Sequence, residues 1–551
     1  MNRGLSVILG LVSCTLLASC ADEKAPDDKP NIIYIMSDDH TTQAIGVYGS
    51  RLATLDPTPN IDRIAQEGMT FDNLFCTNAI CTPSRACIMT GQYSQTNGVL
   101  DLGGRLPLER QYLAHELNAL GYETAVIGKW HLKDAPEAFD YYNVLYNQGE
   151  YFDPVLYEKG SDAMTTMEIF GRDSLMRGSR YTGHSSDVIT DLTLDWLKNK
   201  RDKSKPFFLK HHFKAPHDMF EFNPKYADYL EDTFIPEPES MWDNQHNGSV
   251  ATRGYNDTLL DTIGSSIGKR NVIRNMGMHM GIDPNLPEGE YKRAAYQEYL
   301  KRYLRCVKGV DDNIKRIYIY LEEEGILDNT IIIYSGDQGF MLGEHDYIDK
   351  RWMYEPSMRM PFIVRYPEKI KAGSRTEALA NNTDFAPTMI ALAGGEVPDY
   401  MQGKDLSPVL FNEGAEPADW RTATYYRYWM HMAHKHNNPA HFGIRTKDYK
   451  LIFFYAVDYV ERPAHDASNI EKHPASMSNF KTPVAWELYD LKKDPKELNN
   501  VYGQPAYADI TRQLKEQLLN LRAEINEGDD HYPHIQEIIK RHYYDDIIAQ
   551  E

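Results

Sequence analysis

Side chains with oxygen donors occur in two short segments that lie far apart in the sequence. Asp38 and Asp39 are adjacent, and Asp337 and Gln338 form a second adjacent pair. Carboxylate and amide oxygens are hard ligands that suit Ca²⁺ or Mg²⁺, in contrast to the nitrogen and sulfur donors that zinc and copper select. Because three carboxylates repel one another strongly when they lie together, the pattern predicts a divalent cation between the two segments.

A set of cationic and imidazole side chains could complete a catalytic centre around such a cation. Arg85, Lys129 and Lys350 could bind the oxygens of an anionic substrate, and arginine offers a planar fork of donors for this purpose. His131 and His217 form a titratable pair. One imidazole could accept and return the proton of a nucleophile while the other protonates a departing oxygen, as acid–base hydrolysis requires.

Most of these groups follow an apolar segment that has the composition of a buried β-strand. From Pro30 onward such segments alternate with amphipathic ones. This alternation is typical of an α/β fold with a large mixed, mostly parallel sheet covered by helices. The expected strands are Asn31–Met36, Thr124–Ile127, Pro206–His212, Thr330–Tyr334 and Pro361–Tyr366.

The first four expected strands run into polar sequences, namely SDDH, GKWH, FKAPH and SGDQG. Taken singly, each has an ordinary interpretation as a helix cap, a turn or a loop. Ligands of open α/β sheets bind at the carboxyl ends of the strands. Four such endings in one chain therefore predict that the polar groups converge on a single site.

At positions 81–85 the chain reads CTPSR, which resembles the signature of the type I sulfatases in the alkaline-phosphatase-like superfold. The order DD, CTPSR, GKWH, KAPH, GDQG and a following lysine is similar to that family over nearly the whole mature chain. The resemblance implies that a maturation enzyme oxidises Cys81 to formylglycine, whose hydrated aldehyde attacks the sulfur of a sulfate ester. The alternative is an ordinary thiol ahead of a helix that begins near Ser84.

The same resemblance implies a Ca²⁺ site. Its ligands would be Asp38, Asp39, Asp337 and Gln338, together with an oxygen of the modified Cys81. Mg²⁺ is the less favoured ion. Gln338 departs from the family, in which asparagine or histidine is common, but the amide oxygen survives the change.

The resemblance also implies the catalytic roles. Arg85 would be the partner of the formylglycine, and Lys129 and Lys350 would hold the sulfate group. His131 would act on the formylglycine hydroxyl, and His217 would protonate the departing oxygen.

The alcohol that carries the sulfate is predicted from the resemblance to exported bacterial polysaccharide sulfatases. We expect a sulfated oligosaccharide or polysaccharide, with an algal glycan such as ulvan as the first expectation and a glycosaminoglycan as the second. Candidate substrate contacts are His184, His345, Arg351 and His431. Two other classes stay open, namely a phosphomonoester or phosphodiester hydrolase of the same superfold and a non-catalytic glycan-binding lipoprotein.

The first residues have the pattern of a targeting segment. Arg3 precedes an apolar run over residues 5–17, and the sequence LASC that ends at Cys20 resembles the bacterial lipobox. We expect a lipoprotein signal peptide over residues 1–19, lipidation of Cys20 and a polar tether over residues 20–29. A simple cleavable signal peptide fits the same pattern. The protein is then expected to be exported and held at the cell envelope through a lipid anchor only.

Changes of pattern along the chain predict its organisation. A catalytic domain is expected over residues 30–418, with an insertion over the site at residues 223–289 that a solvated loop would also explain. Short β-type runs predict a smaller antiparallel α+β domain over residues 419–551. Cys76 and Cys87 could form a disulfide in an exported protein, or both could be buried thiols.

Composition limits the remaining function classes. The chain has 551 residues and is 42% hydrophobic, which is enough for a large core and more than one folding unit. Its formal net charge of −21 argues against nucleic acid as a partner, so an anionic substrate would need a locally basic pocket. The sequence contains no common zinc-binding, dinucleotide-binding or Walker motif.

Overall fold

The computed structural model describes most of the chain. The described residues are 1, 29–169, 172–242, 246–254, 276–434, 436–461 and 481–544. The predicted signal peptide, Cys20 and nearly all of the tether fall on residues 2–28, outside the described part, and therefore stay predictions. Among the helices that are described, none is both long and apolar enough to cross a membrane.

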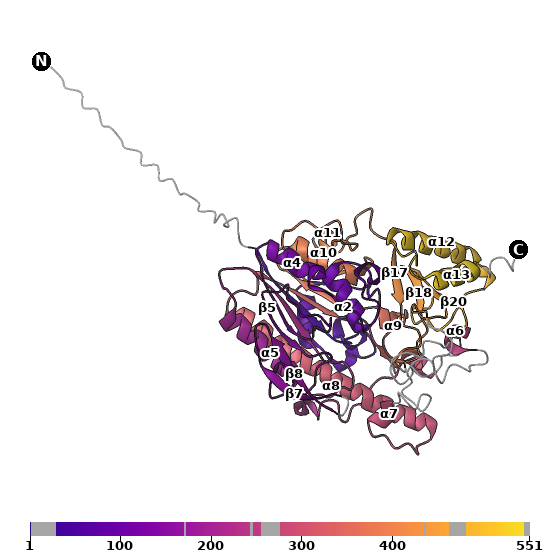
Figure 1. Cartoon of the computed structure of the whole chain (residues 1–551), viewed down its shortest axis with the longest axis horizontal. Coiled ribbons are helices and arrows are strands. Elements are labelled where there is room, and N and C mark those ends of the chain that lie inside the picture. The colour runs from indigo at the N-terminus through magenta and orange to yellow at the C-terminus, as the bar shows by residue number, and fades with distance from the viewer. Residues whose placement is uncertain are drawn as a thin grey trace.

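A ten-stranded mixed sheet forms the centre of the fold (Figure 1). The five strands at its centre run parallel. The strands outside them join through antiparallel pairs, except that the strand at one edge pairs parallel with its neighbour. This confirms the predicted mixed, mostly parallel sheet. In spatial order the strands are β15 (Ser374–Thr376), β2 (Met69–Phe71), β14 (Phe362–Arg365), β11 (Thr330–Gly336), β1 (Asn31–Ser37), β10 (Phe207–Phe213), β4 (Glu123–Gly128), β5 (Tyr141–Leu145), β6 (Val155–Glu158) and β9 (Ser179–Arg180).

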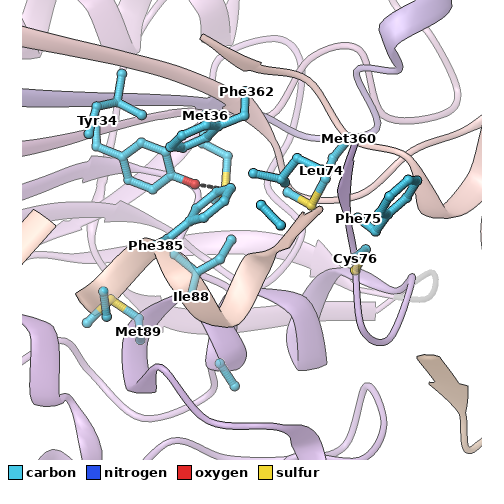
Figure 2. Close-up of a cluster of buried hydrophobic side chains, with 14 of the residues drawn as sticks. Tyr34, Met36, Leu74, Phe75, Cys76, Ile88, Met89, Met360, Phe362 and Phe385 are labelled. Carbon is cyan, nitrogen blue, oxygen red and sulfur yellow. Dashed lines mark hydrogen bonds between the residues drawn. The ribbon is translucent and has the colours of Figure 1, made fainter. Parts of the chain in front are cut away.

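Helices cover both faces of this sheet. Tyr34 and Met36 of β1 pack into one apolar cluster (Figure 2), while Ile33 and Ile35 pack into a second cluster, because successive side chains of a strand point to opposite faces. One cluster contains residues of α2 (Cys81–Thr90), α4 (Tyr112–Ala119) and α10 (Phe385–Leu392), and the other contains residues of α1 (Pro59–Gln66), α5 (Ser185–Asp195) and α8 (Glu288–Glu323).

A second, antiparallel sheet follows the large one in sequence, as predicted. It consists of β17 (Ala423–Tyr428), β18 (His441–Thr446), β19 (Tyr449–Phe454) and β20 (Ala485–Asp490), and it packs with α12 (Ala508–Glu524) and α13 (Pro533–His542). Lys450 of β19 joins the sheet to the rest of the fold, with its ammonium 2.9 Å from Glu355 Oε1 and 2.6 Å from Glu497 Oε1. The exact domain boundaries stay predictions.

Short elements complete the described fold. The hairpin of β7 and β8 extends from the edge of the large sheet and was not among the predicted strands. Parts of the predicted insertion at residues 223–289 carry α6 and α7, and α7 packs against α8. The remaining bounds are β3 (Leu74–Phe75), β7 (Met164–Ile169), β8 (Arg172–Arg177), β12 (Met341–Leu342), β13 (Ile348–Asp349), β16 (Ala380–Asn381), α3 (Ser94–Asn97), α6 (Val250–Arg253), α7 (Met276–His279), α9 (Glu355–Met358) and α11 (Ser407–Leu410).

The start of α2 differs from the expectation. The helix begins at Cys81 rather than near Ser84, so that Cys81 is its first residue. Pro83 is compatible with the earlier start because the first backbone N–H groups of a helix have no intrahelical acceptor, and the missing N–H of proline costs nothing there. Cys81 is therefore part of the helix terminus and not of the preceding loop.

The long helix α8 caps the start of α1 through a buried carboxylate. The N-cap residue of α1, Thr58, makes no side-chain capping bond. Asp311 of α8 accepts hydrogen bonds instead, from the backbone N–H groups of Asn60 at 3.0 Å and Ile61 at 2.9 Å. Burial raises the pKa of Asp311 to about 6, although these donors oppose the shift.

This raised pKa predicts a pH-dependent stability. Folding favours protonated Asp311, so its stabilising contribution is present below about pH 4 and is lost as the pH rises through about 6. Asp311→Asn keeps an acceptor that cannot ionise. Relative to this variant, the wild type should lose about 2–3 kcal/mol of unfolding free energy between about pH 4 and about pH 7, measured by guanidinium denaturation. Asp509→Asn, at a site 85% exposed, should cause no such difference, and identical pH profiles for Asp311→Asn and wild type would contradict the prediction.

Candidate active site

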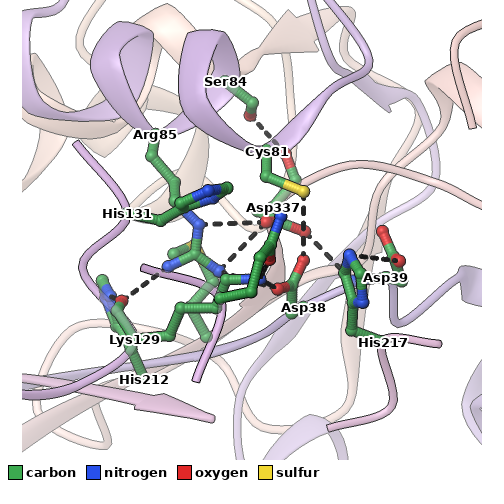
Figure 3. Close-up of polar contacts among 12 residues, drawn as sticks. Asp38, Asp39, Cys81, Ser84, Arg85, Lys129, His131, His212, His217 and Asp337 are labelled. Carbon is green, nitrogen blue, oxygen red and sulfur yellow. Dashed lines mark hydrogen bonds and ion pairs between the residues drawn. The ribbon is translucent and has the colours of Figure 1, made fainter. Parts of the chain in front are cut away.

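Polar segments that follow four adjacent strands meet at one edge of the large sheet (Figure 3). The last residue of β1, Ser37, is in register with Gly336 of β11 and Phe213 of β10, and β4 lies next to β10. Because the four strands run parallel, their carboxyl ends deliver the following residues to the same place. The segments that follow them contain Asp38, Asp39, Lys129, His131, His217, Asp337 and Gln338.

The centre of this region is acidic and fully buried. Asp38, Asp39 and Asp337 each offer an oxygen, and these three oxygens lie within 4.8 Å of one another. The backbone N–H of Asp39 donates to Asp337 Oδ1 at 3.1 Å, which ties the two segments together. The amide nitrogen of Gln338 donates to Asp39, and within the described part of the chain its buried Oε1 has no hydrogen-bond partner. This oxygen set fits a divalent cation.

Two lysines compensate the first pair of carboxylates. Lys129 forms an ion pair with Asp38, and Lys350 lies 2.8 Å and 2.6 Å from the two carboxylate oxygens of Asp39. Burial raises the pKa of Asp39 to about 7 against the opposing effect of Lys350. Burial alone would lower the pKa of Lys350, but Asp39 and the other acidic groups around the lysine together outweigh burial and hold that pKa above its usual value.

Arg85 compensates the third carboxylate. Its Nε donates to Asp337 Oδ2 at 3.1 Å, and a terminal nitrogen lies 3.0 Å from the same oxygen. The other terminal nitrogen donates to the carbonyl oxygen of Lys129 at 2.7 Å. The guanidinium therefore links α2 to the ends of β11 and β4, which only a planar fork of donors can do.

Cys81 lies at the N-terminus of α2, directly against the acidic centre. It is 1% exposed, and its Sγ is 3.4 Å from Asp38 Oδ1. Burial raises the pKa of its thiol to about 12, so an unmodified Cys81 carries almost no thiolate at neutral pH. Cys76 and Cys87 are free and buried, which settles the open question of their pairing in favour of thiols.

The two predicted catalytic histidines follow the carboxyl ends of two neighbouring parallel strands, His131 after β4 and His217 after β10. His131 has a left-handed backbone with φ of 56°, and its carbonyl oxygen accepts from the Thr82 hydroxyl at 3.1 Å. Burial holds the pKa of His131 well below its usual range. His217 Nε2 lies 3.8 Å from Asp39 Oδ2, and burial lowers the pKa of His217 to about 3. Both imidazoles are therefore neutral before substrate binds.

Among the predicted substrate contacts, Arg351 lies beside the site. It follows Lys350, its Nε is 3.5 Å from Asp349 Oδ2, and a terminal nitrogen donates to the Tyr428 hydroxyl at 3.4 Å. His436 also pairs with the Asp349 carboxylate. Sequence reasoning did not single out Asp349. The position of Asp349 immediately before Lys350 was a signal that could have identified it.

The other three predicted contacts are buried and engaged in the protein. His184 caps α5 by accepting from the Ser186 backbone at 3.3 Å, and its Nε2 is 2.9 Å from the Glu221 carbonyl oxygen. The ring of His345 packs at a tilt against that of Tyr354, with the ring centroids 5.0 Å apart. The Nδ1 of His431 accepts from the Ala440 backbone at 3.1 Å. These contacts explain their burial, and a role in substrate binding stays a prediction.

Known proteins match this chain along most of its length. The family model described as Sulfatase matches residues 30–395, and that described as N-sulphoglucosamine sulphohydrolase, C-terminal, matches residues 343–482 and 476–524. An N-acetylglucosamine-6-O-sulfatase of Bacteroides thetaiotaomicron is 38% identical, over 96% of this chain and 93% of the relative. An ulvan-active sulfatase of Formosa agariphila is 26% identical, over 95% and 87% respectively.

A solved structure extends the likeness to three dimensions. It contains a protein in complex with its substrate, D-glucosamine-2-N,6-O-disulfate, and aligns with a TM-score of 0.75 at 38% identity. The alignment covers 91% of this chain and 99% of that protein.

The Lys350–Asp39 pair predicts a strong effect of neutralising the lysine. Lys350→Met should reduce the hydrolysis rate of an aryl sulfate by about 100-fold or more, because Asp39 loses the cation that lowers its pKa and becomes protonated near neutral pH. Steady-state kinetics would measure the loss. Lys496→Met changes a lysine that is 65% exposed and should leave the rate unaltered, whereas an active Lys350→Met variant would rule out this role.

Proposed function

The chain belongs to the sulfatase family and is a sulfuric ester hydrolase, and we propose that its substrate is a glucosamine 6-O-sulfate of a glycosaminoglycan fragment. The observation that carries the proposal is the near full-length likeness to an N-acetylglucosamine-6-O-sulfatase. The solved structure with a bound glucosamine disulfate supports the same class of sugar. The ulvan-active relatives are more distant, so glycosaminoglycan replaces ulvan as the favoured substrate.

The proposed nucleophile is Cys81 after its oxidation to formylglycine by a maturation enzyme. The protonated thiol of the unmodified residue is a weak nucleophile, which supports this modification. In the proposed reaction, one hydroxyl of the hydrated aldehyde passes its proton to His131, and its oxygen bonds to sulfur. The electron pair of the breaking S–O bond passes to the sugar oxygen, which takes a proton from His217. The second hydroxyl then gives its proton to water and becomes the aldehyde oxygen, while the C–O bond to the sulfate group breaks and its electron pair leaves with sulfate. A serine lacks that second hydroxyl.

The proposed metal ligands are Asp38, Asp39, Asp337 and Gln338, with Ca²⁺ favoured over Mg²⁺. Their clustered oxygens and the unsatisfied Oε1 of Gln338 support this set. When bound, the cation would draw electron density from the oxygens of the nucleophile and the sulfate. Lys129 and Lys350 would pair with sulfate oxygens, and the N-terminus of α2 adds partial positive charge beside them.

We also propose that the protein is exported and anchored at the bacterial cell envelope through lipidated Cys20. The support is the N-terminal apolar run and the LASC sequence. Labelling with a radioactive fatty acid would test the anchor, because Cys20→Ala would abolish incorporation into an acylated protein.

The substrate proposal can be tested with matched esters. Protein produced with a formylglycine-generating enzyme should release sulfate from N-acetylglucosamine 6-sulfate and leave N-acetylglucosamine 6-phosphate and ulvan oligosaccharides largely uncleaved. Peptide mass spectrometry should find the modification at Cys81. The matched Cys81→Ser variant should give no turnover, because it can accept a sulfate group but cannot expel it. Preference for the phosphate ester, or full activity of Cys81→Ser, would defeat the proposal.

Metal binding can be tested independently of turnover. After chelation, calorimetric titration should detect one Ca²⁺ per chain. Asp337→Asn should weaken binding by about tenfold or more because it removes one ligand charge. Asp232→Asn makes the same change at an exposed position and should bind Ca²⁺ like the wild type. Tighter binding of Mg²⁺ than of Ca²⁺ would overturn the choice of ion.

A further inference from the structure

Asp218 contacts the imidazole of His217 from the side away from the acidic centre. Its Oδ1 lies 2.6 Å from His217 Nδ1, and its backbone carbonyl oxygen lies 2.8 Å from the same nitrogen. The Asp218 side chain is 35% exposed, while that of His217 is 12% exposed. Within the described residues, the Asp218 carboxylate makes no other hydrogen bond. It is therefore directed at this histidine.

These two contacts determine which ring nitrogen carries hydrogen. A carboxylate oxygen and a backbone carbonyl oxygen are both acceptors, so His217 Nδ1 must be the donor. The opposite nitrogen, Nε2, then has its lone pair directed toward the centre of the site, 3.8 Å from Asp39 Oδ2. Figure 3 places the ring beside Asp39 and below Cys81. Only Nε2 can exchange a proton with a group bound in the centre.

The backbone of His217 is held separately from its ring. The hydroxyl of Tyr151 donates to the His217 carbonyl oxygen, and the His217 backbone N–H donates to the Lys214 carbonyl oxygen at 3.2 Å. These bonds fix the position of the residue but leave rotation about the side-chain bonds free. Among the polar contacts of the ring with described residues, the shortest is that with Asp218, and it restricts the orientation of the ring.

We propose that Asp218 is a positioning residue that orients His217 for protonation of the leaving oxygen. The inference rests on the proposed function. As the S–O bond to the sugar breaks, its electron pair passes to the sugar oxygen, and the proton moves there from His217 Nε2. The ring is neutral before the anionic ester binds, so on binding it must first take up a proton from solvent at Nε2. The resulting imidazolium has hydrogen at both nitrogens, and Asp218 accepts from Nδ1. After the transfer, His217 is neutral and keeps its Nδ1 hydrogen, so the ring does not need to rotate.

This role makes a prediction that depends on the leaving group. A sugar alkoxide is a strong base and requires a proton as it departs, whereas the oxide of an acidic phenol departs without one. Loss of a group that orients the proton donor should therefore slow sugar sulfates much more than aryl sulfates. Damage to the metal site or to the fold would slow both kinds of substrate equally.

The experiment compares Asp218→Asn with the wild type on two esters. On N-acetylglucosamine 6-sulfate, kcat should fall by about 10- to 100-fold with KM nearly unchanged, while kcat on 4-methylumbelliferyl sulfate should change by less than about threefold. Asp218→Glu, which retains the carboxylate, should recover part of the loss on the sugar ester. The control Asp232→Asn removes an exposed charge and should alter neither rate.

A double-mutant cycle identifies the residue through which Asp218 acts. In a His217→Ala background, Asp218→Asn should cause no further loss on the sugar ester, because the group that it orients is absent. Equal losses on both esters, or a further loss in the His217→Ala background, would overturn the inference. If the wild type cleaves the aryl sulfate but no sugar sulfate, the proposed substrate is wrong. If the wild type cleaves a sugar sulfate and Asp218→Asn cleaves it at the same rate, only the positioning role is refuted.

Discussion

The burial of three carboxylates side by side is the electrostatic constraint on which the rest of the site depends. Asp38, Asp39 and Asp337 have no solvent exposure, and each buried charge costs several kcal/mol even after relaxation of the protein. The positive charges that compensate them are Arg85 of α2, Lys129 after β4 and Lys350 after β13. Three cations against three carboxylates leave the centre near neutrality, so a bound divalent cation makes it positive and suited to an anionic ester.

The large sheet stabilises this concentration of buried charge because it holds the backbones of the participating residues rigidly. β1 is buried on both faces and hydrogen-bonded to a parallel strand on each side, so Asp38 and Asp39 begin from a fixed point. Several residues in the site have left-handed backbones, among them Asp39, His131 and Asp349. Such conformations cost about 1–3 kcal/mol each and persist only where surrounding contacts determine them. The chemistry therefore depends on the scaffold as much as on the reactive groups.

The sequence was sufficient to predict the sheet and the residues that meet at its edge. Apolar strand segments ending in SDDH, GKWH, FKAPH and SGDQG led to the correct four strands and to one site. It was not sufficient for the surroundings of those groups. The carboxylate of Asp218 and the cluster of Asp349, Arg351 and His436 depend on side-chain orientation, which residue type does not encode. His184 was a plausible substrate contact in the sequence, whereas in the structure it caps a helix.

By itself, the sequence determined the fold class, the order of the motifs and the residue types that meet at the sheet edge. These follow from hydrophobic periodicity and from local motifs, which act over short stretches of chain. Only the tertiary structure decided that α2 begins at Cys81, that Cys76 and Cys87 are unpaired, and that Lys350 faces Asp39. The Lys350–Asp39 pair joins residues 311 positions apart, and its geometry is set by the packing of the whole sheet and its helices rather than by any local preference.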